Sequence, residues 1–212
     1  MPALHPVEIF AVLFLLAYVL LAARESRWCW PVSIIGVILY SIRAVKVQLY
    51  GEIPLQLYYV AVSVYAWFAW KGGKGKKGKG LAVSRMTHRQ WVLFLGSGTA
   101  LTLAYGYFLD HIVESAQFLG WENAAGYLPP SAYPYADAFT TAFSFLATWL
   151  QARKKIENWL IWLIVDSVYI ALWSLRGGYF FALLSLLYLG LSVYGYRKWR
   201  VSLRQASLSA SS

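Results

Sequence analysis

The chain has 212 residues, of which 59% are hydrophobic, 18% are aromatic and only 13% are charged. This composition excludes a soluble globular domain and predicts an integral membrane protein. The formal net charge is +10, and the positions of the charges explain it without a nucleic-acid partner.

Seven apolar runs are each long enough to cross about 30 Å of hydrocarbon as a helix. They lie near residues 6–23, 31–50, 53–70, 90–109, 135–152, 157–175 and 179–197. The runs exceed the roughly 10 residues of a membrane β-strand and lack its two-residue alternation. No Lys or Arg precedes the first run, which favours a membrane span over a signal peptide. We therefore expect an all-α integral membrane protein with seven transmembrane helices.

Lys and Arg are divided unevenly between the two sides of the membrane. The segments after the first, third, fifth and seventh helices contain 16 of them, whereas the opposite side contains Arg43, Lys46 and Arg176. Because positively charged loops stay in the cytoplasm, we expect a multi-pass membrane protein with its N-terminus outside and its C-terminus inside. The basic stretch "KGGKGKKGKG" at 71–80 has Gly80 where a phosphate-binding loop needs Ser or Thr, so it is predicted to be a flexible linker.

The two halves of the chain resemble each other at an offset of 129 residues. Arg24 and Trp30 align with Arg153 and Trp159, and "SVYAWFAW" at 63–70 aligns with "SVYGYRKW" at 192–199. Since one helix joins two groups of three, the groups point the same way across the membrane. Parallel repeats of this kind are typical of transporters that hold a substrate between them near the midplane.

The domain organisation follows from this repeat. We expect a first three-helix bundle in residues 1–70, a basic cytoplasmic linker, connecting helix and external loop in residues 71–134, a second three-helix bundle in residues 135–199, and a disordered cytoplasmic tail in residues 200–212.

One face of the sixth predicted helix combines aromatic side chains with an acid. It contains Trp159, Trp162, Asp166, Tyr169 and Trp173. A charge at the bilayer centre costs at least about 2.5 to 3.5 kcal/mol on insertion scales, so Asp166 should face the bundle interior or a water-filled cavity. Two interpretations stay open, a ligand-facing carboxylate and a structural acid paired with Ser167, a Tyr hydroxyl or an Arg.

The third helix has a second polar stripe of Gln56, Tyr59, Ser63 and Trp67, and its counterparts in the repeat are Ser185, Tyr188, Ser192 and Tyr196. Helix packing alone would satisfy the three Ser hydroxyls, and Gln56 suits either role. Trp28, Trp30, Trp70 and Trp199 lie at predicted cytoplasmic helix ends and are interpreted as interfacial belt residues. Glu8 and Asp137 lie in first helical turns, where they either complement the helix dipole or attract cationic solutes at the external face.

Three segments resemble the Pnu family of bacterial vitamin transporters: "RESRWCWPVSIIGVILYSI", "LQLYYVAVSVYAWFAW" and "ARKKIENWLIWLIVD". The resemblance spans essentially the whole chain, and the ENWxxW segment is its most specific element. It implies one small vitamin held between two three-helix bundles, facilitated diffusion, no cofactor or metal, and a homo-oligomer, with a trimer as one form.

The resemblance also implies a substrate site. The family positions that surround nicotinamide riboside correspond to Gln56, Ser63, Trp159, Trp162 and Asp166, and we add Tyr59, Tyr169 and Tyr188 from the stripes. Ser63 and Asp166 stand where nicotinamide riboside carriers have Asn. A carboxylate favours a cationic substrate that stacks on Trp, so the sequence predicts a thiamine carrier.

Two alternatives remain, a nicotinamide riboside carrier of the same family and a seven-helix sensor or assembly subunit. An enzyme is not expected, because HExxH, GxSxG and Cys/His motifs are lacking and the three His residues fall in predicted loops.

Overall fold

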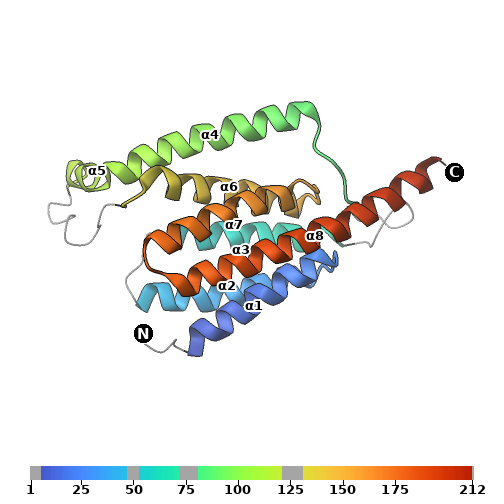
Figure 1. The fold of residues 1–212 in the computed structure, drawn as a ribbon, viewed down its shortest axis with the longest axis horizontal. Coiled ribbons are helices and arrows are strands. Elements are labelled where there is room, and N and C mark those ends of the chain that lie inside the picture. Colours follow the sequence, from blue (N-terminus) through green and yellow to red (C-terminus); the bar gives the residue numbers. More distant parts are fainter. Residues whose placement is uncertain (1–5, 47–52, 72–80, 121–130, 212) are drawn as a thin grey trace. The chain divides into compact units, whose positions relative to one another are not determined.

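The computed structural model describes residues 6–46, 53–71, 81–120 and 131–211. These residues form eight α-helices and no strand, apart from a single bridge between Ser84 and Lys155. The helices are α1 (Pro6–Ala23), α2 (Cys29–Lys46), α3 (Ile53–Ala69), α4 (His88–Asp110), α5 (Ile112–Phe118), α6 (Pro134–Ala152), α7 (Asn158–Leu175) and α8 (Tyr179–Ser211) (Figure 1). The prediction of an all-α protein is confirmed.

Within the described residues, three helices are long and apolar enough to cross a membrane. They are His88–Asp110, Asn158–Leu175 and the Tyr179–Gln205 part of α8. Ile9–Ala23, Cys29–Ile42 and Leu55–Ala69 are shorter apolar helices. The end of the predicted span 31–50 and residues 72–80 of the basic linker lie outside the described residues.

Two helical segments differ from the prediction. Helix α5 lies in the segment that was predicted as an external loop. It has only seven residues and contains Glu114, so the sequence did not mark it as a membrane span. Helix α8 continues to Ser211, so the prediction of a disordered tail is wrong for residues 200–211. This segment contains no Gly or Pro that would end a helix, and extending an existing helix needs no new nucleus.

The chain divides into two compact units. The first unit consists of Met1–Arg85, Thr148–Leu160 and Leu187–Ser212, and the second consists of Met86–Ala147 and Ile161–Leu186. Helices α6, α7 and α8 therefore each contribute one segment to each unit.

In the first unit, α2 packs against both α1 and α3 (Figure 1), and four tryptophans fill the core. The rings of Trp30 and Trp70 meet edge to face at 5.3 Å, and those of Trp159 and Trp199 do the same at 5.5 Å. These two pairs occupy equivalent repeat positions, and Trp70 also lies 6.0 Å from Trp199. The interpretation of Trp30, Trp70 and Trp199 as belt residues is wrong, because all three are buried. Trp28, which is 59% exposed, remains compatible with it.

The last turns of α1 and α6, also in the first unit, have the same unusual backbone. Glu25 and Lys154 have φ values of 56° and 50°. The N–H of the following residue reaches back to Leu21 in one turn and to Leu150 in the other. This is the Schellman helix end, in which the left-handed position is usually Gly. A side chain in this conformation destabilises the fold by about 1 kcal/mol, and this cost arises at both repeat-equivalent positions.

In the second unit, α4 packs closely against α6 through glycines. A Cβ at Gly98 would lie 2.6 Å from the Phe143 ring, and a Cβ at Gly106 would overlap the Tyr135 ring. Helix α4 begins with a capping box, in which the Thr87 hydroxyl accepts from the Gln90 N–H and the Gln90 side chain accepts from the Thr87 N–H. This cap fixes the start of α4 two residues earlier than predicted and makes His88 helical.

Candidate functional site

Helix α7 is continuous from Asn158 to Leu175, so the stripe predicted from helical spacing exists as one helix face. Trp162, Tyr169 and Trp173 are half-buried on it, and Asp166 is only 4% exposed. The Ser167 hydroxyl donates to the Leu163 carbonyl on its own helix, which satisfies this group without Asp166. The stripe therefore presents a shielded carboxylate between half-buried aromatic rings.

Trp159 differs from the other members of the stripe because its surroundings are filled. It is 1% exposed, its ring meets Trp199 at 90°, and a Cβ at Gly195 would lie 2.6 Å from the ring. Only a glycine leaves room for the indole there. This geometry favours a packing role for Trp159. Trp162 and Asp166 are better candidates than Trp159 for contact with a ligand.

Two residues of the polar stripe predicted on α3, Gln56 and Ser63, are also buried, and the structure gives Ser63 a partner. The Ser63 hydroxyl donates to the Ser33 hydroxyl on α2 at 3.3 Å, and the Ser185 hydroxyl donates to the Phe181 carbonyl. Both bonds fit the packing interpretation of these serines. Gln56 is 8% exposed. The sequence analysis missed Ser33, whose role depends on its contact with Ser63 of another helix.

Tyrosines from three helices gather in the first unit. The Tyr18 hydroxyl of α1 lies within electrostatic range of Tyr58, Tyr59 and Tyr188, and the rings of Tyr58 and Tyr59 meet at 5.7 Å. The structure thus brings together two predicted site residues, Tyr59 and Tyr188, and adds Tyr18. Nothing in the spacing along α1 singles out Tyr18, because its importance comes from the helices that pack against it.

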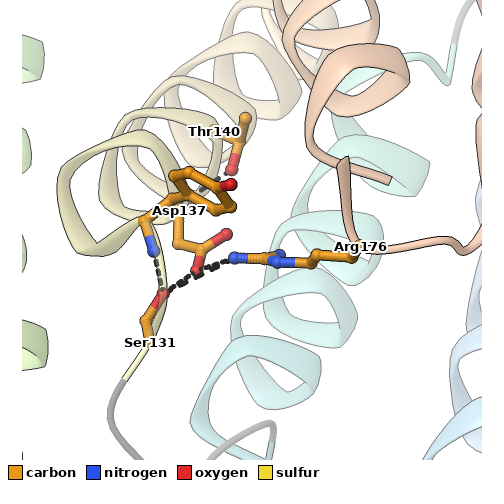
Figure 2. A network of polar contacts seen from close by, with 5 residues as sticks. Ser131, Asp137, Thr140 and Arg176 are labelled. Carbon is orange, nitrogen blue, oxygen red and sulfur yellow. Dashed lines mark hydrogen bonds and ion pairs between the residues drawn. The ribbon is translucent and has the colours of Figure 1, made fainter. Parts of the chain in front are cut away.

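At the start of α6, in the second unit, Asp137 takes part in a network of polar contacts (Figure 2). Its Oδ2 accepts from the Arg176 guanidinium at 2.6 Å and from the Ser131 hydroxyl. The guanidinium also lies over the Tyr133 ring, and the Thr140 hydroxyl donates to the Asp137 carbonyl. Because Arg176 balances the carboxylate, the arrangement supports a structural role for Asp137 better than attraction of cationic solutes.

A cavity of about 350 Å³ lies elsewhere in the first unit, between the end of α1 and the middle of α8. Its lining consists of Ala23, Arg24, Glu25, Tyr194, Lys198 and Ser202. None of the predicted substrate residues lines it.

Known proteins similar to this chain are membrane transporters. A family model described as "Nicotinamide mononucleotide transporter" matches residues 5–201. The nicotinamide riboside transporter PnuC of Escherichia coli is 27% identical over 193 residues, which cover 87% of this chain and 81% of that protein. The riboflavin/roseoflavin transporter RibM of Streptomyces davaonensis is 27% identical over 189 residues, which cover 88% and 81%.

A solved structure is similar over most of its length. The crystal structure of the vitamin B3 transporter PnuC superposes with a TM-score of 0.69 over 94% of this chain and 83% of that chain, at 24% sequence identity. This likeness shows a shared fold.

Proposed function

Since this chain belongs to the nicotinamide mononucleotide transporter family, the PnuC family of membrane vitamin transporters, we propose that its substrate is nicotinamide riboside. The similarity to PnuC supports this choice over thiamine, which none of the similar proteins named above is said to carry. The observation that supports a cationic vitamin is Asp166, a buried carboxylate on the aromatic face of α7, and the similarity to PnuC selects nicotinamide riboside among such vitamins. Nicotinamide riboside has a cationic ring that suits such a face, because aromatic faces and carboxylates both attract cations.

Within this proposal, Trp162 and Tyr169 stack against the vitamin and Asp166 accepts its hydrogen bonds or pairs with its charge. Gln56, Ser63, Tyr59 and Tyr188 are the proposed polar contacts from the other repeat helices, and Trp159 completes the proposed set. The shielded position of Asp166 supports its role, because charge-assisted hydrogen bonds are strongest away from water.

We also propose seven membrane spans in a three-plus-one-plus-three order, with the N-terminus outside and the C-terminus in the cytoplasm. Transport is by facilitated diffusion, in which the two three-helix bundles rock around the vitamin. The repeat-equivalent tryptophan pairs and helix ends support two related bundles. The distribution of Lys and Arg supports the orientation. A homo-oligomer, with a trimer as the expected form, belongs to the same proposal.

Thiamine is the second candidate, because Ser63 and Asp166 replace two amides that the resemblance associates with nicotinamide riboside. A carboxylate in place of an amide favours a cation that also donates hydrogen bonds, as the aminopyrimidine of thiamine does.

Isothermal titration calorimetry on the detergent-purified protein separates these candidates, with nicotinamide riboside, thiamine and riboflavin titrated in parallel. We expect nicotinamide riboside to bind most tightly. Asp166→Ala should weaken that binding by about 10-fold to 100-fold, the equivalent of one charge-assisted hydrogen bond, whereas Asp166→Asn, which installs the residue that the resemblance associates with nicotinamide riboside, should keep it. Ser167→Ala is the matched control, because Ser167 is an exposed neighbour bonded to its own helix.

If thiamine binds more tightly than nicotinamide riboside, thiamine becomes the first candidate substrate. If Asp166→Ala binds nicotinamide riboside as well as the unmodified protein does, Asp166 is a structural acid.

A further inference from the structure

The two unusual helix ends place opposite charges side by side. Glu25 follows α1 and Lys154 follows α6, at positions 129 residues apart. Lys154 Nζ lies 3.1 Å from Glu25 Oε2, and the two side chains are only 3% and 4% exposed. The ammonium also lies 4.6 Å from the centre of the Trp70 ring. A left-handed backbone at each residue directs these side chains together, where a glycine would have closed the turn without strain.

Two tryptophans hold the same helix ends from the opposite repeat. The Trp70 indole of α3 donates to the Ala152 carbonyl at the end of α6, at 2.9 Å. The Trp199 indole of α8 donates to the Ala22 carbonyl at the end of α1, at 3.0 Å. Each repeat thus caps a helix of the other, and the ion pair lies where the two caps meet.

Stability alone does not explain this arrangement. A buried ion pair usually gains little over well-packed apolar side chains, whereas losing one partner is strongly unfavourable. Backbone strain that persists at two equivalent positions is typical of a functional site. An ion pair differs from apolar packing in that water can replace its partners when the two sides separate.

We propose that the Glu25–Lys154 ion pair is a latch that joins the two repeats on the cytoplasmic side and opens during each transport cycle. The inference rests on the proposed function, since only a carrier with this orientation needs such an opening. The cavity lined by Arg24, Glu25 and Lys198 lies on the Glu25 side of the pair.

The chain contains its own reporter for this opening. Cys29 is the single cysteine, is 0% exposed, and belongs to the same core cluster as Trp30, Trp70 and Ala152. With the latch closed, a maleimide cannot reach the thiol. This cluster includes residues at the ends of both α1 and α6, so separation of the two ends should open it, and the labelling rate of Cys29 then measures how often the latch opens.

The experiment measures the rate of Cys29 labelling by N-ethylmaleimide in purified protein and by a membrane-impermeant maleimide in vesicles of both orientations. Glu25→Gln and Lys154→Gln each remove one partner, and Glu25→Lys combined with Lys154→Glu exchanges them. The exchange should be tolerated, because it keeps one positive and one negative side chain at the same two positions. Arg24→Gln is the matched control, since Arg24 is an exposed cation beside Glu25.

Each single variant should raise the labelling rate at least about tenfold, which corresponds to about 1.4 kcal/mol. The exchanged pair should return it to within about threefold of the original rate, and Arg24→Gln should leave it unchanged. The impermeant reagent should reach Cys29 in inside-out vesicles only. If a single variant does not fold, a folded, slowly labelled exchange variant still supports the latch.

The proposal is overturned if both single variants label at the original rate, if the exchange variant labels as fast as the single variants or fails to fold, or if labelling comes from the external side. These outcomes are distinguishable from failure of the proposed function. A protein that binds no vitamin in calorimetry loses the carrier assignment, whereas one that binds nicotinamide riboside but shows no labelling difference loses only the latch.

Discussion

Trp70→Phe tests whether the indole caps are energetically important, and it should cost more than the equivalent change Trp199→Phe. The Ala152 carbonyl accepts the Trp70 N–H, while the N–H groups of Lys155 and Ile156 donate to Leu150 and Ser84. Removing the indole therefore leaves a buried carbonyl unsatisfied, at a cost of about 1 to 3 kcal/mol. Weakening of the Lys154 cation–π contact adds to this, so we expect a total loss of roughly 2 to 4 kcal/mol.

Trp199→Phe leaves the Ala22 carbonyl with a second donor, the Glu25 N–H at 2.9 Å. The expected loss is therefore smaller, about 0.5 to 1.5 kcal/mol. Trp28→Phe is the control, and since Trp28 is 59% exposed its loss should stay within about 0.5 kcal/mol.

The assay is the free energy of unfolding of the purified protein, measured by titration with a denaturing detergent. Equal losses for Trp70→Phe and Trp199→Phe would contradict the argument that a second donor protects the Ala22 carbonyl but not the Ala152 carbonyl. A loss for Trp70→Phe no greater than that for Trp28→Phe would refute the idea that the indole caps matter.

Two further changes test the packing of each unit. Gly195→Val should lower the free energy of unfolding by about 1 to 3 kcal/mol by displacing the Trp159 ring; Gly190→Ala is its control, because a Cβ at Gly190 meets nothing within 4 Å, and equal effects would contradict the close fit. Asp137→Asn should cost less than about 1 kcal/mol, and less still at high salt, because the Asp137 and Arg176 side chains are 25% and 29% exposed. A salt-independent loss above about 2 kcal/mol would instead make the network in Figure 2 a buried structural element.

The sequence predicted the positions of the long helices well, because hydropathy and helix-breaking residues act locally. It failed at the end of α8, where a polar composition suggested disorder but nothing stops the helix. It also failed for Trp30, Trp70 and Trp199. Interfacial and buried tryptophans both occur near helix ends, so sequence position does not tell them apart. Here the indoles of Trp70 and Trp199 are buried where they bond to the ends of α6 and α1.

The candidate site was predictable to a similar extent. Helical periodicity correctly grouped Trp162, Asp166 and Tyr169 on one face of α7. Periodicity within one helix carries no information on which residues of other helices approach it, so Ser33 and Tyr18 were missed. The paired turns were missed for another reason, because a charged residue at a left-handed helix end contradicts the local preference for Gly that a sequence pattern relies on.

The repeat divides into a part that stays symmetric and a part that has diverged. At the ends of α1 and α6, tryptophans and turns correspond at the offset of 129, each end accepts an indole N–H from the other repeat, and even the charges are complementary. Further along α2 and α7 the correspondence ends. At the same offset, Trp162 and Asp166 align with the smaller residues Ser33 and Val37. Two related bundles can move against each other only if their contact surfaces match, whereas one asymmetric vitamin needs unlike walls. The second repeat would therefore need side chains that bind the vitamin, whereas both repeats would need matching side chains where they close against each other. These two requirements differ along the same helices.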